Sequence, residues 1–206
     1  QEGLAYRITP FNTTKLNARI DSEKMYDNLM HKFKFGGIDK DGIYLDETVM
    51  RMCQTHRRMF VQVAGQLIKE GKYDKAKKAL DYSLQVIPST TVPHSYAASS
   101  SKEMADQYIA LGDTASAKMI LSDLANKSIE YVTWYLSLND SQFTNSYIEC
   151  GQNMLMLDEI CKSLARISSA GVSNKEDQEQ SSDMALHYAK KFEELYHMFN
   201  ERIGKK

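Results

Sequence analysis

Apolar and polar residues alternate at helical spacing along most of the chain after residue 45. Between about residue 46 and residue 70 the apolar stripe steps by three and four residues, which places its members on one face of an α-helix. Asp46 stands where a helix N-cap is expected, and Gly71 stands where the helix is expected to end. The stripe consists of Val49, Cys53, His56, Phe60, Val63 and Leu67. Such a face must pack on a partner, and residues 73–86 supply one as a predicted antiparallel helix.

The first 45 residues have a different pattern. Polar and apolar residues alternate over 6–11, and glycines interrupt residues 36–42. We expect an extended start, one short helix over roughly residues 22–33, and an irregular connection to the helix that begins near Asp46.

The predicted helix pair resembles the tetratricopeptide repeat. Small residues where two helices approach closely, a glycine in the turn and a proline after the second helix are typical of that repeat. Gly71 and Gly112 are as far apart as Ala76 and Ala117, which indicates an internal repeat. The first set of anchors is Phe60, Ala64, Leu67, Gly71, Tyr73, Ala76, Ser83, Leu84 and Pro88, and the second is Met104, Ala105, Tyr108, Gly112, Ala117 and Leu121.

No proline follows Pro93, so the main helix breaker is absent from more than half of the chain. We therefore predict an all-α fold in which antiparallel helix pairs stack as a tetratricopeptide-like right-handed array over residues 46–167. The polar stretch over 168–182 predicts a mobile loop, and residues 183–206 predict a C-terminal helix that caps the array. Residues 1–45 are expected to form the short irregular N-terminal segment.

The charge balance narrows the classes of partner. The 206 residues contain 26 Lys and Arg against 27 Asp and Glu, a formal charge of -1, which argues against binding to nucleic acid or to an anionic membrane surface. The mean hydropathy of -0.49 and the hydrophobic share of 42% are typical of a soluble globular chain. No stretch approaches the roughly 18 apolar residues that span a bilayer.

Familiar catalytic and metal-binding patterns do not occur in the sequence. Cys53, Cys150 and Cys161 form no Cys-x-x-Cys motif, and the five histidines show no metal-ligand spacing. Neither a glycine-rich phosphate loop nor a Gly-x-Ser-x-Gly elbow is present. We therefore predict no catalytic residues, no metal and no cofactor.

A basic cluster on the first long helix is one candidate binding site. His56 is followed by Arg57 and Arg58, which together have the chemistry to bind an anion or a phosphate, or to line a substrate groove. Other interpretations stay open, because His56 lies on the apolar stripe and fits a hydrogen-bonded core histidine. The two arginines also fit ion pairs with acidic neighbours or contacts with a partner.

The most concentrated aromatic segment, residues 131–136, is a second candidate. Tyr131, Trp134 and Tyr135 offer large contact areas that suit a peptide anchor or stacking on a sugar ring. Packing between helices also explains the same residues, so both interpretations stay open.

Several stretches resemble the C-terminal soluble region of a large family of multi-spanning membrane proteins of Bacteroidetes. That family has no known function and is similar to the protein O-mannosyltransferases. The similarity spans roughly residues 3–165 and rests on GLAYRITPF (3–11), MYDNLM (25–30), YLDE (44–47), MRMC (50–53), THRRMF (55–60), LANK (124–127) and WYLSL (134–138).

The resemblance implies a domain on the periplasmic face of the inner membrane, downstream of a membrane part that uses lipid-linked sugars. The catalytic acidic residue of such transferases lies in a membrane-proximal loop, so no position here inherits it. The chain begins with Gln1 rather than Met, and we expect it to be a piece of a longer protein. The expected partners are an acceptor or partner polypeptide and the membrane part of its own chain.

The leading functional hypothesis is a non-catalytic, tetratricopeptide-like interaction domain whose helical groove binds polypeptide. The alternative is a glycan- or phosphate-binding domain that helps to complete the transferase active site through Arg57, Arg58 and Trp134. A third hypothesis is a structural spacer whose basic and aromatic residues are all internal. The sequence leaves the oligomeric state open.

Overall fold

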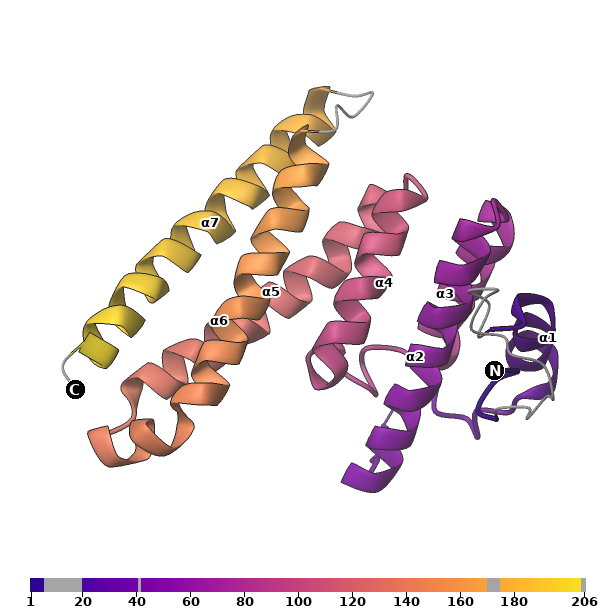
Figure 1. Cartoon of the computed structure of the whole chain (residues 1–206), viewed down its shortest axis with the longest axis horizontal. Helices are drawn as coiled ribbons and strands as arrows, with labels where there is room; N and C mark the ends of the chain where they lie inside the picture. The colour runs from indigo at the N-terminus through magenta and orange to yellow at the C-terminus, as the bar shows by residue number, and fades with distance from the viewer. Residues whose placement is uncertain (6–19, 41, 170–174, 205–206) are drawn as a thin grey trace, which may run out of the picture. The chain divides into compact units, whose positions relative to one another are not determined.

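A computed structural model describes residues 1–5, 20–40, 42–169 and 175–204, and all regular secondary structure within these ranges is helical (Figure 1). The predicted all-α fold is confirmed. The elements are α1 (Ser22–Asp27), η2 (Asn28–Lys32), α2 (Glu47–Lys69), α3 (Tyr73–Val86), η3 (His94–Ala97), α4 (Ala98–Ala110), α5 (Thr114–Ser137), α6 (Asp140–Ser169) and α7 (Lys175–Gly204).

The chain divides into two compact units, Gln1–Leu111 and Gly112–Lys206. The boundary falls inside the block of residues 46–167, and it separates α4 from α5, the two helices of the predicted second repeat. Each unit is described by itself. The right-handed stacking of a tetratricopeptide-like array therefore stays a prediction.

The hairpin of α2 and α3 forms where the hydrophobic pattern predicts it. The Asp46 carboxylate accepts a hydrogen bond from the Val49 amide (2.9 Å), which caps the first turn of α2. Gly71 has a φ of +73°, a conformation that glycine adopts without strain, and it ends the helix as expected. Most of the predicted stripe is buried, namely Cys53, Phe60, Val63 and Leu67.

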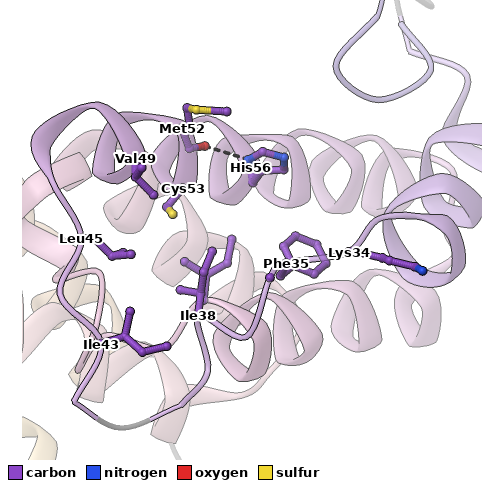
Figure 2. Close-up of a pocket in the computed structure, with 11 residues that line it drawn as sticks. Lys34, Phe35, Ile38, Ile43, Leu45, Val49, Met52, Cys53 and His56 are labelled. Carbon is purple, nitrogen blue, oxygen red and sulfur yellow. Dashed lines mark hydrogen bonds between the residues drawn. The ribbon is translucent and has the colours of Figure 1, made fainter.

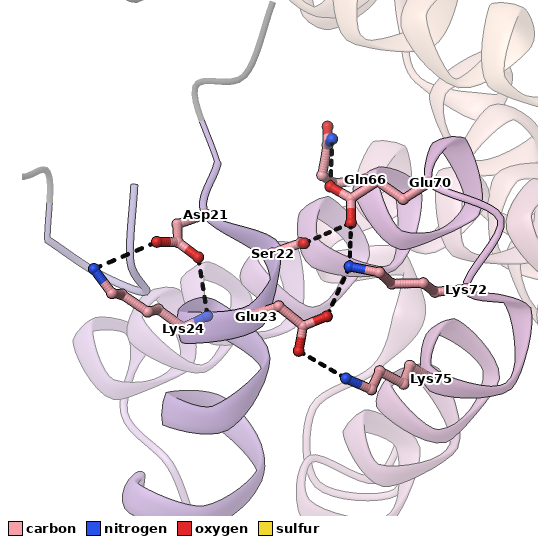
Figure 3. A network of polar contacts seen from close by, with 8 residues as sticks. All are labelled: Asp21, Ser22, Glu23, Lys24, Gln66, Glu70, Lys72 and Lys75. Carbon is pink, nitrogen blue, oxygen red and sulfur yellow. Dashed lines mark hydrogen bonds and ion pairs between the residues drawn. The ribbon is translucent and has the colours of Figure 1, made fainter. Parts of the chain in front are cut away.

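The short helix expected over 22–33 is also confirmed, as α1 followed by η2. A polar network joins it to the turn between α2 and α3 (Figure 3). Glu23 contacts the ammonium groups of Lys72 and Lys75 at 2.7 Å each, and the Ser22 hydroxyl donates to Glu70 at 2.7 Å. The extended start predicted over 6–11 lies outside the described residues.

Helix α4 packs closely on α2 because a glycine leaves room for a buried side chain. Gln107 is buried and donates from its amide nitrogen to the Val61 carbonyl at 2.9 Å. A Cβ added to Gly65 would lie 2.9 Å from that same nitrogen. Tyr108 extends the contact to α3, where its hydroxyl donates to Asp81 at 2.9 Å.

The second unit is built from α5, α6 and α7, and each of these helices packs on the other two. The α7 side chain of Tyr188 reaches α5, where its hydroxyl lies 3.1 Å from the Asn126 side-chain oxygen. The buried core is formed by residues of all three helices, among them Leu121, Leu124, Val132, Cys150, Leu157, Ile160, Leu164, Tyr188 and Leu195.

The polar loop predicted over 168–182 is wrong for most of its length. Ser168 and Ser169 belong to α6, residues 175–182 belong to α7, and residues 170–174 lie outside the described part. Polar composition favours a loop, but Glu, Gln and Lys are also good helix formers. Contacts with neighbouring helices hold this part of α7, since Ser181 is buried beside the Lys118 ammonium at 3.2 Å.

Candidate functional site

Arg57 is not at the surface, and its interpretation as a binding or surface-paired residue is wrong. Its side chain is fully buried. The guanidinium donates to the carbonyls of Ile87 at 2.9 Å and Val92 at 2.7 Å, with a longer contact to the Pro93 carbonyl at 3.4 Å. A cation beside the last carbonyls of a helix is favourably placed. Arg57 therefore holds the end of α3 and the segment that follows it.

Arg58 and His56 lie in different surroundings from Arg57. Arg58 is exposed, because adjacent positions on an α-helix point about 100° apart. His56 is half-buried, with Nδ1 2.8 Å from the Met52 carbonyl and its ring edge-to-face with Phe33 and Phe35. The three residues therefore do not form one basic cluster, and His56 fits the hydrogen-bonded packing role.

Sequence reasoning missed the titratable group beside Arg57. His94 is buried, and its Nδ1 lies 3.3 Å from the Ser101 hydroxyl. Burial and the neighbouring Arg57 charge lower the pKa of His94 from 6.5 to about 4. The imidazole is thus neutral at physiological pH.

A pocket of about 380 Å³ lies beside His56, between α2 and the loop that precedes it (Figure 2). Figure 2 shows the Lys34 side chain directed away from the hollow, so apolar groups dominate the interior. Burial raises the pKa of the Cys53 thiol in its wall, which disfavours the reactive thiolate. The lining is Lys34, Phe35, Gly36, Ile38, Ile43, Leu45, Val49, Met52, Cys53, His56 and Ile87.

The aromatic residues predicted as a site lie on α5 in the second unit. Tyr131 and Trp134 are exposed, Trp134 to 54%, whereas Tyr135 is half-buried. The rings of Trp134 and Tyr135 approach to 4.9 Å between centroids. Burial raises the pKa of Tyr135. Tyr135 thus has a packing role, and Tyr131 with Trp134 forms a small exposed aromatic face.

A mainly apolar groove of about 710 Å³ lies between α6 and α7. Its α7 wall has Phe192, Tyr196, Phe199 and Ile203, which follow one another by three and four residues. Its α6 wall has Tyr147, Ile148, Gly151, Gln152, Met154, Leu155 and Asp158. We call this feature the α6–α7 groove.

The groove is open to solvent although most of its lining is apolar. Leu155 is 67% exposed and Tyr196 is 50% exposed. At Gly151 the backbone of α6 lies close to the Phe199 ring, since an added Cβ would be in van der Waals contact with it at 3.7 Å. From Phe192 to Ile203 the α7 wall extends roughly 17 Å at 1.5 Å per residue. The groove is thus long enough for about three turns of another helix.

Arg202 closes one end of the three-helix unit. Its guanidinium donates to the carbonyls of Leu136 and Leu138 at the end of α5, and it lies 4.5 Å from the centre of the Phe143 ring. The charge of this arginine is therefore engaged with the end of α5, in the way that Arg57 is engaged with the end of α3.

Two cysteine thiols in this unit lack the features of reactive groups. Burial raises the pKa of Cys150 and of Cys161 to about 11. Within residues 1–5, 20–40, 42–169 and 175–204, no three His, Cys, Asp or Glu side chains come together as a metal site. In the same ranges, no helix has both the length and the hydropathy to cross a bilayer. Comparisons with protein-family models, with curated proteins and with solved structures found no match to this chain.

Proposed function

We propose that this chain is a non-catalytic helical interaction domain and that the α6–α7 groove binds a helical segment of a partner polypeptide. The observation that carries the proposal is the exposed apolar lining of that groove. Leu155 and Tyr196 stand half or more in water, and exposed apolar patches of this kind mark interaction sites.

The shape of the groove favours a helix over an extended peptide. Two antiparallel helices present parallel rows of side chains, and a third helix packs into the furrow between them. Strand addition, one mode by which an extended peptide binds, needs the free edge of a sheet, and the described residues contain no strand. Aromatic side chains such as Tyr147 and Tyr196 are typical anchors at the centre of such contacts.

The resemblance to the O-mannosyltransferase-like family supports a wider setting for the proposal. In that setting the domain is the periplasmic C-terminal part of a membrane protein and presents acceptor polypeptides. An antiserum against this domain tests the setting in fractionated native cells. A band much heavier than 23.5 kDa in the inner-membrane fraction supports it, and a band near 23.5 kDa in the soluble fraction contradicts it.

Site-specific photo-crosslinking tests polypeptide binding directly. A benzophenone amino acid replaces Tyr196 in the groove or Tyr73 on α3, which is exposed to a similar degree. We expect crosslinks from Tyr196 to a defined polypeptide segment of amphipathic helical sequence, and none of that segment from Tyr73. The proposal fails if both positions give the same mixture of products.

One observation favours glycan binding as a second candidate. Trp134 and Tyr131 offer an exposed aromatic face of the kind that stacks on sugar rings. Arg57 has no part in it, because its side chain is buried. Trp134 is the sole tryptophan of the chain, so a glycan that stacks there must change the intrinsic tryptophan fluorescence. An unchanged spectrum across a glycan panel removes this candidate.

A further inference from the structure

Carboxylates edge both walls of the α6–α7 groove. On α6, Asp158 lines the groove, and Glu159 is the exposed residue one turn beyond Leu155. On α7, the exposed Glu193 directly follows Phe192. Because the floor of the groove is apolar and its edges are acidic, a helix with basic flanks is favoured over one with acidic flanks.

The acidic character extends over both helices. Together α6 and α7 carry 11 Asp and Glu against 6 Lys and Arg, a net charge of -5, whereas the whole chain carries only -1. The near neutrality of the chain therefore hides a segregation of charge, with negative charge concentrated on the helices that form the groove.

Several basic side chains of these helices are engaged locally. The ammonium of Lys162 contacts Asp158 at 2.6 Å, and that of Lys191 contacts Glu194 at 2.8 Å. The Arg202 guanidinium donates to the carbonyls at the end of α5. Each of the two ion pairs engages one carboxylate together with one ammonium group, so the attraction for a basic helix rests on Glu159 and Glu193.

We propose that the occupant of the α6–α7 groove is an amphipathic helix whose apolar stripe is flanked by Lys or Arg. This inference rests on the proposed function and adds the chemistry of the partner. Apolar contacts with residues such as Leu155 and Tyr196 hold the helix, while Glu159 and Glu193 attract its basic flanks. A second copy of this chain is disfavoured as occupant, because it would bring together two helix pairs that each carry a net charge of -5.

Two synthetic helical peptides test the inference by fluorescence anisotropy with the full chain. Both carry the same leucine stripe over four turns, and their flanks are lysine in one and glutamate in the other. The groove variant Leu155→Gln/Tyr196→Gln changes two exposed side chains and leaves the net charge unaltered. The edge variant Glu159→Gln/Glu193→Gln has a matched control in Glu47→Gln/Asp74→Asn, which removes two exposed carboxylates from the other unit.

We expect the lysine peptide to bind about tenfold more tightly than the glutamate peptide at physiological salt. The groove variant should lose binding of the lysine peptide, and the edge variant should weaken it about threefold relative to its control. If both peptides bind equally and both need the groove, the charge inference is overturned and the proposed function stands. If the groove variant binds the lysine peptide as well as the unaltered chain does, both are overturned.

Sedimentation velocity tests the competing occupant. The inference predicts a monomer at micromolar concentration. A dimer that dissociates in the groove variant would assign the groove to a second copy and overturn the inference.

Discussion

Replacing Arg57 by methionine removes the donor of two short hydrogen bonds to backbone carbonyls, those of Ile87 and Val92. Methionine keeps most of the apolar stem, so little cavity is created. A hydrogen bond from a charged donor contributes about 1.5–3 kcal/mol, and each buried carbonyl left without a donor costs about 1–3 kcal/mol. Relief of the buried charge offsets part of this loss. We expect the first unit to be destabilised by about 3 kcal/mol.

Arg58→Met is the matched control, because it makes the same chemical change one residue later at an exposed position. Exposed substitutions of this kind change the free energy of unfolding by about 0.5 kcal/mol or less. The difference in the free energy of unfolding between the two variants therefore reports the effect of burial, since the residue types exchanged are the same.

Hydrogen exchange followed by mass spectrometry is the suitable assay, because two units need not unfold as one. A loss of about 3 kcal/mol corresponds to roughly 100-fold faster exchange of the protected amides of α3 in Arg57→Met. Exchange in α6 should not change in either variant. If Arg57→Met and Arg58→Met exchange alike in α3, Arg57 does not hold the end of that helix and the reasoning is refuted.

Three further predictions concern the first unit. Because the pKa of His94 is lowered to about 4 in the folded chain, the unfolded chain binds the proton at a higher pH than the folded one does. The free energy of unfolding should therefore fall by about 3 kcal/mol in total as the pH drops from 6.5 to 4. In His94→Gln the urea midpoint should depend less on pH over that range. Gly65→Ala should lower the free energy of unfolding by about 1 kcal/mol, since the clash with Gln107 outweighs the gain in helix propensity. In a Gln107→Ala background the same substitution should raise it by about 1 kcal/mol. A stabilising effect of Gly65→Ala in the unaltered chain would contradict the contact. Contacts with Lys72 above all lower the pKa of Glu70 to about 2, so its contribution to stability is present above pH 4.5 and is lost toward pH 2. The protection factors of the α1 amides, corrected for the pH dependence of intrinsic exchange, should fall over that range and should fall less in Glu70→Gln.

The α2–α3 hairpin could be predicted from sequence because local signals agree there. Asp46 and Gly71 mark the ends of α2, and the apolar stripe between them repeats at helical spacing. Local signals of this kind did not predict the buried position of Arg57. It is four residues after Cys53 and three before Phe60, so it shares the buried face, but its charge favours a surface assignment. The carbonyls that accept its hydrogen bonds lie 30 and 35 residues away and carry no local signature.

The α6–α7 groove escaped prediction for a related reason. Tyr188, Phe192, Leu195 and Phe199 follow one another at helical spacing, which predicts a single packed stripe on the last helix. The structure buries Tyr188 and Leu195, whereas Phe192 and Phe199 line the groove. The sequence did hold one signal: the apolar face of the last helix is wider than packing against a single helix requires. Such a helix either packs between two neighbours or leaves part of its apolar face uncovered. Sequence periodicity does not say which.

Charge distribution links the two arginines that lie at helix ends. Arg57 and Arg202 each direct a positive charge to backbone carbonyls, at the end of α3 in one unit and of α5 in the other. An inventory of sequence charges counts both as available to partners. Only Arg202 belongs to the helices that form the α6–α7 groove, and its engagement with the end of α5 leaves less positive charge on α7 for a partner. Under the inference proposed above, the partner must supply positive charge of its own, because these two arginines of the chain serve its folding.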